Sequence, residues 1–362
     1  MQFIDLQAQQ IRIKKDVDLA VAAVLNHGRY ILGPEVEQLE TLMAEYVGAE
    51  YCLTCANGTD ALQVALMSLG VGNGDEVIIP NFTYIAPAET VKLLGANIVL
   101  VDIDPNSYNI DATKIESAIS TKTKAIIGVS LFGQCADFNN INKIAEKHGI
   151  PVIEDAAQSF GASHHGKKSC NLTTIACTSF FPSKPLGCYG DGGALFTNNA
   201  ELALKMRQIA RHGQKERYHH VRVGVNSRMD TVQAAILLCK LKIFDDEVKL
   251  RQEVASRYDQ FFSSSDNIFR PTLTEGNTSV WAQYTIRVKN RNRLSDELKK
   301  VGIPTAIHYP LTVDAQPAMN IEIKTPMLSH GIARTVISLP MHPYLEDFDI
   351  ETISQKILEL VS

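Results

Sequence analysis

The sequence predicts an α/β protein with a mainly parallel sheet and a second, smaller C-terminal domain. A chain of 362 residues is long enough for a large core and a further domain. Between about residue 50 and residue 200, short apolar runs alternate with longer helical patterns, which is typical of crossover connections between parallel strands. After residue 245 comes a charged helix and then a shorter αβ mixture. We therefore predict a large domain over residues 1–245 and a small domain over residues 246–362.

The composition restricts the class of protein. Hydrophobic residues make up 45% and charged residues 21%, which is ordinary for a packed, enzyme-sized protein. The formal charge of −5 provides no basic excess for a phosphate backbone, so we expect no nucleic-acid partner. We also expect no membrane span and no secretory leader. Seven scattered cysteines then indicate reduced thiols and a cytoplasmic protein, and no His, Cys or carboxylate cluster has the spacing of a metal site.

Five short apolar runs are predicted to be strands, and several of them end in polar or acidic residues. In open α/β sheets, ligands bind beyond the carboxyl ends of the strands. Asp155 lies at such an end and could hold the proton of an aromatic ring nitrogen, although a strand-end aspartate often only caps a turn. The predicted strands are Glu76–Pro80, Asn97–Asp102, Lys124–Ser130, Pro151–Asp155 and Ala194–Thr197.

Three helices are predicted from their periodicity: Asp60–Leu69, Asp230–Phe244 and Asp245–Phe262. The first follows the turn Asn57-Gly58-Thr59, whose backbone N–H groups and hydroxyl would suit a phosphate monoester. Alone this signal is weak, because most Gly-Thr helix starts are only N-caps.

The segment from Ser179 to Gly193 places a single lysine, Lys184, between an apolar run and a glycine-rich turn. Ser179 is close enough in sequence to bind a phosphate beside that amine, and one aromatic of Asn81-Phe-Thr-Tyr84 could stack on a flat ring while the other joins the core. Each feature has an ordinary structural explanation. Together, a phosphate cradle, a ring-nitrogen acid, a stacking aromatic and a Schiff-base lysine are what pyridoxal 5′-phosphate requires.

At these motifs the sequence resembles the sugar-nucleotide aminotransferases of the DegT/DnrJ/EryC1/StrS family, over nearly the whole chain. The resemblance implies PLP fold type I, with a mainly parallel seven-stranded sheet in the large domain and a smaller C-terminal αβ domain. The segments that carry it are Gly28–Pro34, Ala56–Leu62, Ile153–Ser159, Ser179–Gly193, Gly224–Asp230, His308–Pro310 and Ser338–Pro343.

The resemblance also implies roles for individual residues. Lys184 matches the Schiff-base lysine and Asp155 the partner of the pyridine nitrogen, and we predict these two to be catalytic. Asn226 matches a residue that reaches the phosphate of the neighbouring subunit, which implies a homodimer with shared active sites. The remaining matches are the phosphate ligands Gly58, Thr59 and Ser179, the residue beside the ring oxygen, Gln158, the stacking residue, Tyr84, and the substrate pocket, His308 and Tyr309.

As the resemblance implies, the reaction is transamination of a UDP-linked oxo sugar with L-glutamate as the donor. The Ser179–Gly193 segment is similar to the subgroup that acts on UDP-2-acetamido-2-deoxy-3-oxo-glucuronate in the synthesis of surface polysaccharides such as O-antigen. A nucleotide-linked 4-oxo-6-deoxy sugar is the alternative substrate. A sugar dehydratase is disfavoured because those relatives carry histidine in place of the lysine, and a non-catalytic regulatory protein is disfavoured by the intact Lys184, Asp155 and Ser179.

The carboxylate and diphosphate of such a substrate require cations. We predict Arg228 first and Arg29 second as their ligands. His219 and His220 are further candidates, although a solvated loop is the favoured interpretation for that pair.

Overall fold

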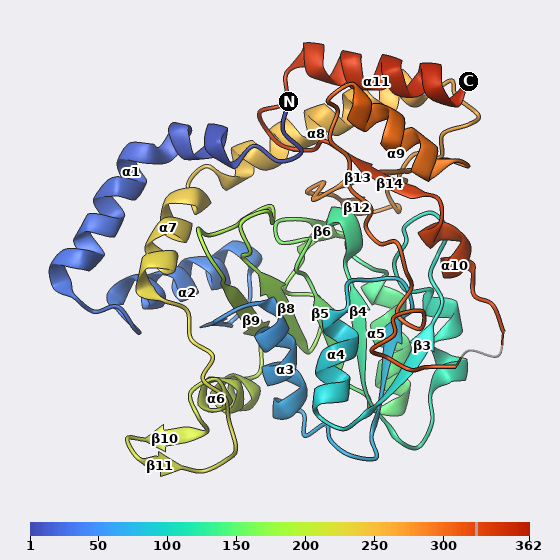
Figure 1. Ribbon diagram of the computed structural model, residues 1–362. Helices are drawn as coiled ribbons and strands as arrows, with labels where there is room; N and C mark the ends of the chain where they lie inside the picture. The colour runs from blue at the N-terminus through green and yellow to red at the C-terminus, as the bar shows by residue number, and fades with distance from the viewer. Residues whose placement is uncertain (323–324) are drawn as a thin grey trace.

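The computed structural model describes residues 1–322 and 325–362, and its centre is a seven-stranded sheet (Figure 1). The strand order is β1-β9-β8-β5-β4-β2-β3. Because β9 pairs antiparallel with both β1 and β8, the other six strands are mutually parallel. This confirms the predicted fold class. The strands are β1 (Tyr51–Cys55), β2 (Glu76–Pro80), β3 (Asn97–Val101), β4 (Thr123–Val129), β5 (Val152–Asp155), β8 (Ile175–Ser179) and β9 (Gly193–Thr197).

Helices cover both faces of the sheet, and alternate residues of one strand show this. Val77 and Ile79 of β2 pack with α3 (Gly58–Ser68), α4 (Ala86–Leu93) and α6 (Ala200–Ile209). Ile78 points the other way and packs with α5 (Phe138–His148). On that second face, α2 (Pro34–Val47) and α7 (Thr231–Leu241) cover β9 and its neighbours.

Two segments extend beyond this layered body. Helix α1 (Leu6–His27) lies along α7, at the left of Figure 1, and buries only Gln9, Ile13, Val17 and Val24. The hairpin of β10 (Gln214–Glu216) and β11 (His219–His220) projects at the lower edge of the figure. None of the helices within the described residues is both long and apolar enough for a transmembrane segment.

The C-terminal part has a core of its own, formed around Tyr258, Tyr284 and Ile353. Its elements are α8 (Phe244–Phe262), β13 (Tyr284–Arg287), α9 (Arg291–Lys300), α10 (Leu328–Ala333), β14 (Val336–Leu339) and α11 (Asp347–Val361). The predicted helix Asp230–Phe244 ends earlier, at Leu241. The predicted domain boundary at residue 245 falls in the first turn of α8, which packs on both cores, and it stays a prediction.

Candidate active site

The carboxyl ends of the parallel strands meet at one edge of the sheet, and four of the predicted segments lie there. Asn57 and Gly58 follow β1, and Asn81–Tyr84 follow β2. Asp155 is the last residue of β5 and Ser179 the last residue of β8. Strand polarity therefore gathers residues that are more than a hundred positions apart in the chain.

The N-terminus of α3 is open toward a ligand. The Asn57 side chain accepts the Asp60 N–H at 2.8 Å, and the Asn57 carbonyl accepts the Ala61 N–H at 3.1 Å. The first two N–H groups of the helix, those of Gly58 and Thr59, have no intrahelical acceptor by helix geometry. They can bind an anion, favoured by the helix dipole.

Close packing at this point requires glycine. A Cβ atom on Gly58 would lie 2.7 Å from the Cβ of Ser179, and one on Gly193 would lie 2.5 Å from the backbone of Asn57. Both distances are below any real carbon–carbon contact. Glycine thus lets the start of α3 approach the end of β8 and the start of β9, which brings the Ser179 hydroxyl beside the free N–H groups.

Asp155 and Lys184 influence one another electrostatically. Burial raises the pKa of Asp155, opposed by the hydrogen bond that its Oδ1 accepts from Ala157 N–H at 3.0 Å and by the charge of Lys184. Burial lowers the pKa of Lys184, opposed by the charge of Asp155. Desolvation therefore increases the neutral, nucleophilic fraction of the Lys184 amine.

Gln158 and Tyr309 join the C-terminal part of the chain to this edge. Gln158 accepts the Phe132 N–H at 2.8 Å through Oε1 and donates to the Tyr309 hydroxyl at 3.1 Å through Nε2. The Tyr309 ring centroid lies 5.9 Å from that of Tyr84. Tyr84 is 54% exposed whereas Phe82 is 1% exposed, so one aromatic is free to stack and the other belongs to the core.

His308 is the neutral member of this group. Its Nδ1 lies 2.9 Å from the Ser338 hydroxyl. Burial and the nearby charge of Lys184 lower the pKa of His308 to about 4. At neutral pH its imidazole is therefore uncharged and can accept or donate a hydrogen bond, but it cannot neutralise an anion.

The other predicted residues form a second group around the start of α7. Asn226 is exposed, and the hydroxyl of the next residue, Ser227, accepts the Ala56 N–H at 3.2 Å, two residues before Gly58. Arg228 is half-buried, and its Nε is a buried donor without an acceptor in the described part of the chain. Arg29 is exposed; its neighbour Tyr30 accepts the Thr231 N–H at 2.8 Å. His219 and His220 stay exposed on the hairpin.

Two side chains of α7 that were not among the predicted site residues hold the lysine loop. Gln233 Oε1 accepts the Tyr189 N–H at 2.9 Å. Lys240 Nζ donates to the Gly187 carbonyl at 2.5 Å and lies 4.4 Å from the Tyr189 ring centroid. Burial lowers the pKa of Lys240 to about 8. A lysine within an apolar helical pattern was the available signal, because such a side chain must find a buried acceptor.

The chemistry of its side chains identifies this site, whereas two surface hollows lie elsewhere. Two surface hollows of about 540 and 570 Å³ lie beside residues 104–113 and share no lining residue with either group. The first group, in contrast, combines free helix N–H groups, a hydroxyl, a buried carboxylate and a desolvated amine. These are the residues that pyridoxal phosphate needs for its phosphate, ring nitrogen and aldehyde, so the site fits the cofactor.

Sequence similarity to known proteins supports this interpretation of the site. Residues 11–358 match the model of the DegT/DnrJ/EryC1/StrS aminotransferase family. The chain is 61% identical, over 98% of both chains, to the UDP-2-acetamido-2-deoxy-3-oxo-D-glucuronate aminotransferase of Pseudomonas aeruginosa.

Structural similarity to solved proteins supports the same interpretation. A DegT DnrJ EryC1 StrS aminotransferase from Brucella abortus has a TM-score of 0.97 and 44% identity over 100% of both chains. NtdA from Bacillus subtilis, solved with bound cofactor PMP, has a TM-score of 0.90 and 30% identity over 97% of this chain and 82% of that one. The chain therefore belongs to the DegT/DnrJ/EryC1/StrS aminotransferase family and is a pyridoxal-phosphate-dependent sugar-nucleotide aminotransferase.

Proposed function

We propose that this enzyme transfers the amino group of L-glutamate to UDP-2-acetamido-2-deoxy-3-oxo-D-glucuronate, in the cytoplasmic synthesis of surface polysaccharide precursors such as those of O-antigen. The observation that carries the proposal is the desolvated amine of Lys184 beside Asp155, in a chain 61% identical to the relative that bears this substrate in its name. The seven cysteines are all free and buried, which is consistent with a reducing compartment.

Residues of this chain would hold the cofactor and move a proton during the reaction. When bound, pyridoxal phosphate supplies an aldehyde that carries the amino group and a ring that accepts electrons. Gly58, Thr59 and Ser179 would hold its phosphate, Tyr84 would stack on the ring, and Asp155 would hold the proton of the ring nitrogen. The Nζ of Lys184 would accept the proton that leaves the Cα of the donor, because desolvation keeps part of this amine neutral.

The sugar nucleotide would lie between the two groups of residues. His308 and Tyr309, on the C-terminal part of the chain, would line the side next to Lys184; the charge of Lys184 acts on His308, and Tyr309 is bonded to Gln158. The Nε of Arg228, which has no acceptor among the described residues, supports a role in binding the carboxylate or diphosphate, with Arg29 as a second cation.

A homodimer would complete the site. Exposed apolar side chains lie on the segments that surround the second group: Tyr30, Ile31, Phe181 and Tyr189. Surfaces of this kind mark protein–protein contacts. A twofold neighbour covering them would bring its exposed Asn226 to the phosphate site, as the family resemblance implies.

The visible absorption spectrum of the purified protein with pyridoxal phosphate tests this proposal. Adding L-glutamate alone should shift the cofactor band, and adding UDP-2-acetamido-2-deoxy-3-oxo-D-glucuronate should then restore it. A panel that includes nucleotide-linked 4-oxo-6-deoxy sugars tests the sugar. Restoration by those sugars but not by the uronate would overturn the substrate assignment, and an unchanged spectrum would overturn the donor.

A further inference from the structure

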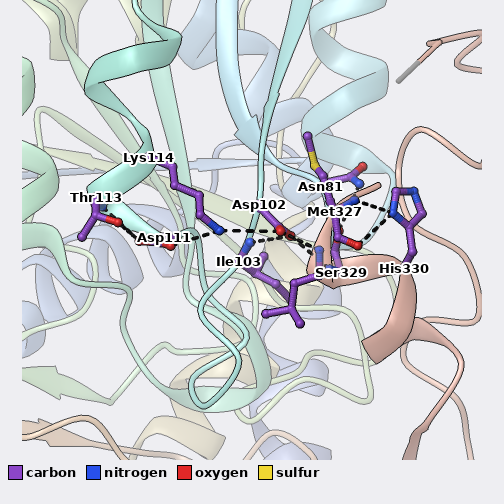
Figure 2. A network of polar contacts seen from close by, with 10 residues as sticks. Asn81, Asp102, Ile103, Asp111, Thr113, Lys114, Met327, Ser329 and His330 are labelled. Carbon is purple, nitrogen blue, oxygen red and sulfur yellow. Dashed lines mark hydrogen bonds and ion pairs between the residues drawn. The ribbon is translucent and has the colours of Figure 1, made fainter. Parts of the chain in front are cut away.

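A polar network with a buried centre at Asn81, Asp102 and Ser329 joins the C-terminal segment to the ends of β2 and β3 (Figure 2). Asn81, which directly follows β2, is fully buried and is the network residue nearest to the site in sequence. Asp102 follows β3 and accepts the backbone N–H groups of Leu328 at 2.6 Å and Ser329 at 3.0 Å. These contacts attach the segment that begins at His308 to the sheet edge.

All four polar groups of Asn81 are engaged. Its N–H donates to the Val101 carbonyl at 2.9 Å, and its carbonyl accepts the Val313 N–H at 2.8 Å. Its Oδ1 accepts the Asp314 N–H at 3.1 Å, and its Nδ2 donates to the Ser329 hydroxyl at 3.1 Å. One residue therefore ties strand β2 to two points of the C-terminal segment.

The two ends of this connection both lead into the site. Asn81 lies three residues before Tyr84, and Asp314 lies five residues after Tyr309. Asp314 is itself fixed, since its Oδ2 pairs with His330 Nε2 at 2.8 Å. Asn81 is thus bonded to the segment that carries the Tyr309 ring, which lies 5.9 Å from the Tyr84 ring and whose hydroxyl accepts from Gln158 Nε2.

We propose that Asn81 is a positioning residue for the sugar half of the reaction, acting through Tyr309 and His308 without touching substrate or cofactor. This proposal rests on the proposed function of the site. Asn81 makes no hydrogen bond to Lys184, Asp155 or Ser179 among the described residues. Its loss should therefore affect the donor half less than the sugar half, because Lys184, Asp155 and Ser179 keep all their contacts.

The test compares Asn81→Ala with Asn171→Ala. Asn171 is the control, because its amide also makes side-chain hydrogen bonds, to Val47, Gly48 and Asn198 at the C-terminal end of α2. The two half-reactions are measured separately by rapid mixing, through the visible absorption of the bound cofactor. For Asn81→Ala we expect the apparent second-order rate constant for the UDP-oxo sugar to fall about tenfold, with the rate for L-glutamate kept within about twofold.

A second readout does not depend on turnover. Hydrogen exchange at the Asp314 amide should be faster in Asn81→Ala than in the wild type or in Asn171→Ala, because the acceptor Oδ1 is gone. If Asn81→Ala does not fold, Ser329→Ala replaces it; this variant removes the acceptor of the Nδ2 group together with the side-chain contact to Asp102, and should slow the sugar half by about threefold.

The outcomes separate this proposal from the proposed function. Equal slowing of both halves, or a sugar half no slower than in Asn171→Ala, would overturn the role of Asn81. If the wild type reacts with L-glutamate but with no UDP-oxo sugar, the substrate assignment fails instead. In that case the hydrogen-exchange rate of the Asp314 amide alone tests the positioning role of Asn81, and an unchanged rate rejects that role.

Discussion

At the residue scale, two adjacent acids of β5 lie on opposite faces of the sheet, because successive side chains of a strand alternate between the two faces. Asp155 faces the site with Lys184, whereas Glu154 is fully buried on the other face. Glu154 accepts the hydroxyls of Ser130 at 2.9 Å and Ser169 at 2.7 Å, and the Cys170 N–H at 2.9 Å. Burial outweighs these bonds and raises the pKa of Glu154 to about 7.

This shift predicts a pH-dependent stability. The folded state binds the Glu154 proton more tightly than the unfolded state, in which the pKa of this carboxyl is near 4.5. The stabilisation that protonated Glu154 adds to the free energy of unfolding is therefore fully present below about pH 4.5. It is lost as the pH rises through about 7, by about 3 kcal/mol in total. Glu154→Gln should keep its thermal midpoint better than the wild type between about pH 5 and about pH 8. Parallel pH curves for the two proteins would contradict the shift.

Replacing the lysine predicts a loss of chemistry without a loss of fold. Lys184→Ala should abolish transamination, because no amine remains to move the Cα proton, while the far-ultraviolet circular dichroism should stay unchanged. Lys240→Met provides the comparison, since it removes a buried amine that only holds the loop, and it should retain part of the activity. Measurable turnover by Lys184→Ala would refute the assigned role.

At the element scale, the start of α3 depends on the close approach of three segments. Gly58→Ala would place a Cβ 2.7 Å from Ser179, so the helix start must move away from β8. We expect the affinity for pyridoxal phosphate to fall by about tenfold or more, since the N–H groups no longer converge with the Ser179 hydroxyl. Gly72→Ala is the control, because a Cβ there meets no atom within 4 Å. Fluorescence titration with the cofactor measures both; equal affinities would argue against a cradle at α3.

Some elements could be read from the sequence and others could not. The strands β2, β3, β4, β5 and β9 agree with the predicted runs, because each contains a run of adjacent apolar residues. Strands β1 and β8 were missed, since Cys, Thr and Ser interrupt their apolar pattern and burial comes only from their neighbours in the sheet. The outer helix α1 has few buried side chains, so its periodicity is weak.

At the scale of the whole molecule, shared sites predict complementation between inactive variants. If Asn226 serves the neighbour's cofactor, a heterodimer of Lys184→Ala and Asn226→Ala contains one intact site. Random mixing should then recover about a quarter of the wild-type activity. Differently tagged, co-expressed chains allow the heterodimer to be purified and assayed. Lys184→Ala with Asp155→Asn is the control, because both residues belong to the same chain's site, and it should recover nothing.

The sequence by itself determined the class of fold and the chemistry. Alternation of apolar runs and helices specifies a parallel sheet, and the chemical needs of one cofactor select Lys184, Asp155, Ser179 and the start of α3. Both signals come from short segments of the sequence, so a single sequence is enough to recognise them.

Only the tertiary structure decided which distant residues meet. Strand polarity places the ends of β1, β2, β5 and β8 at one edge, strand order decides which of them are neighbours, and burial shifts the pKa values of Lys184 and Glu154. The bonds from Asn81 to Asp314 and Ser329 span more than 230 positions, and no local pattern encodes them. Side-chain contacts and desolvation depend on the packed chain, which is why periodicity and motifs could not supply them.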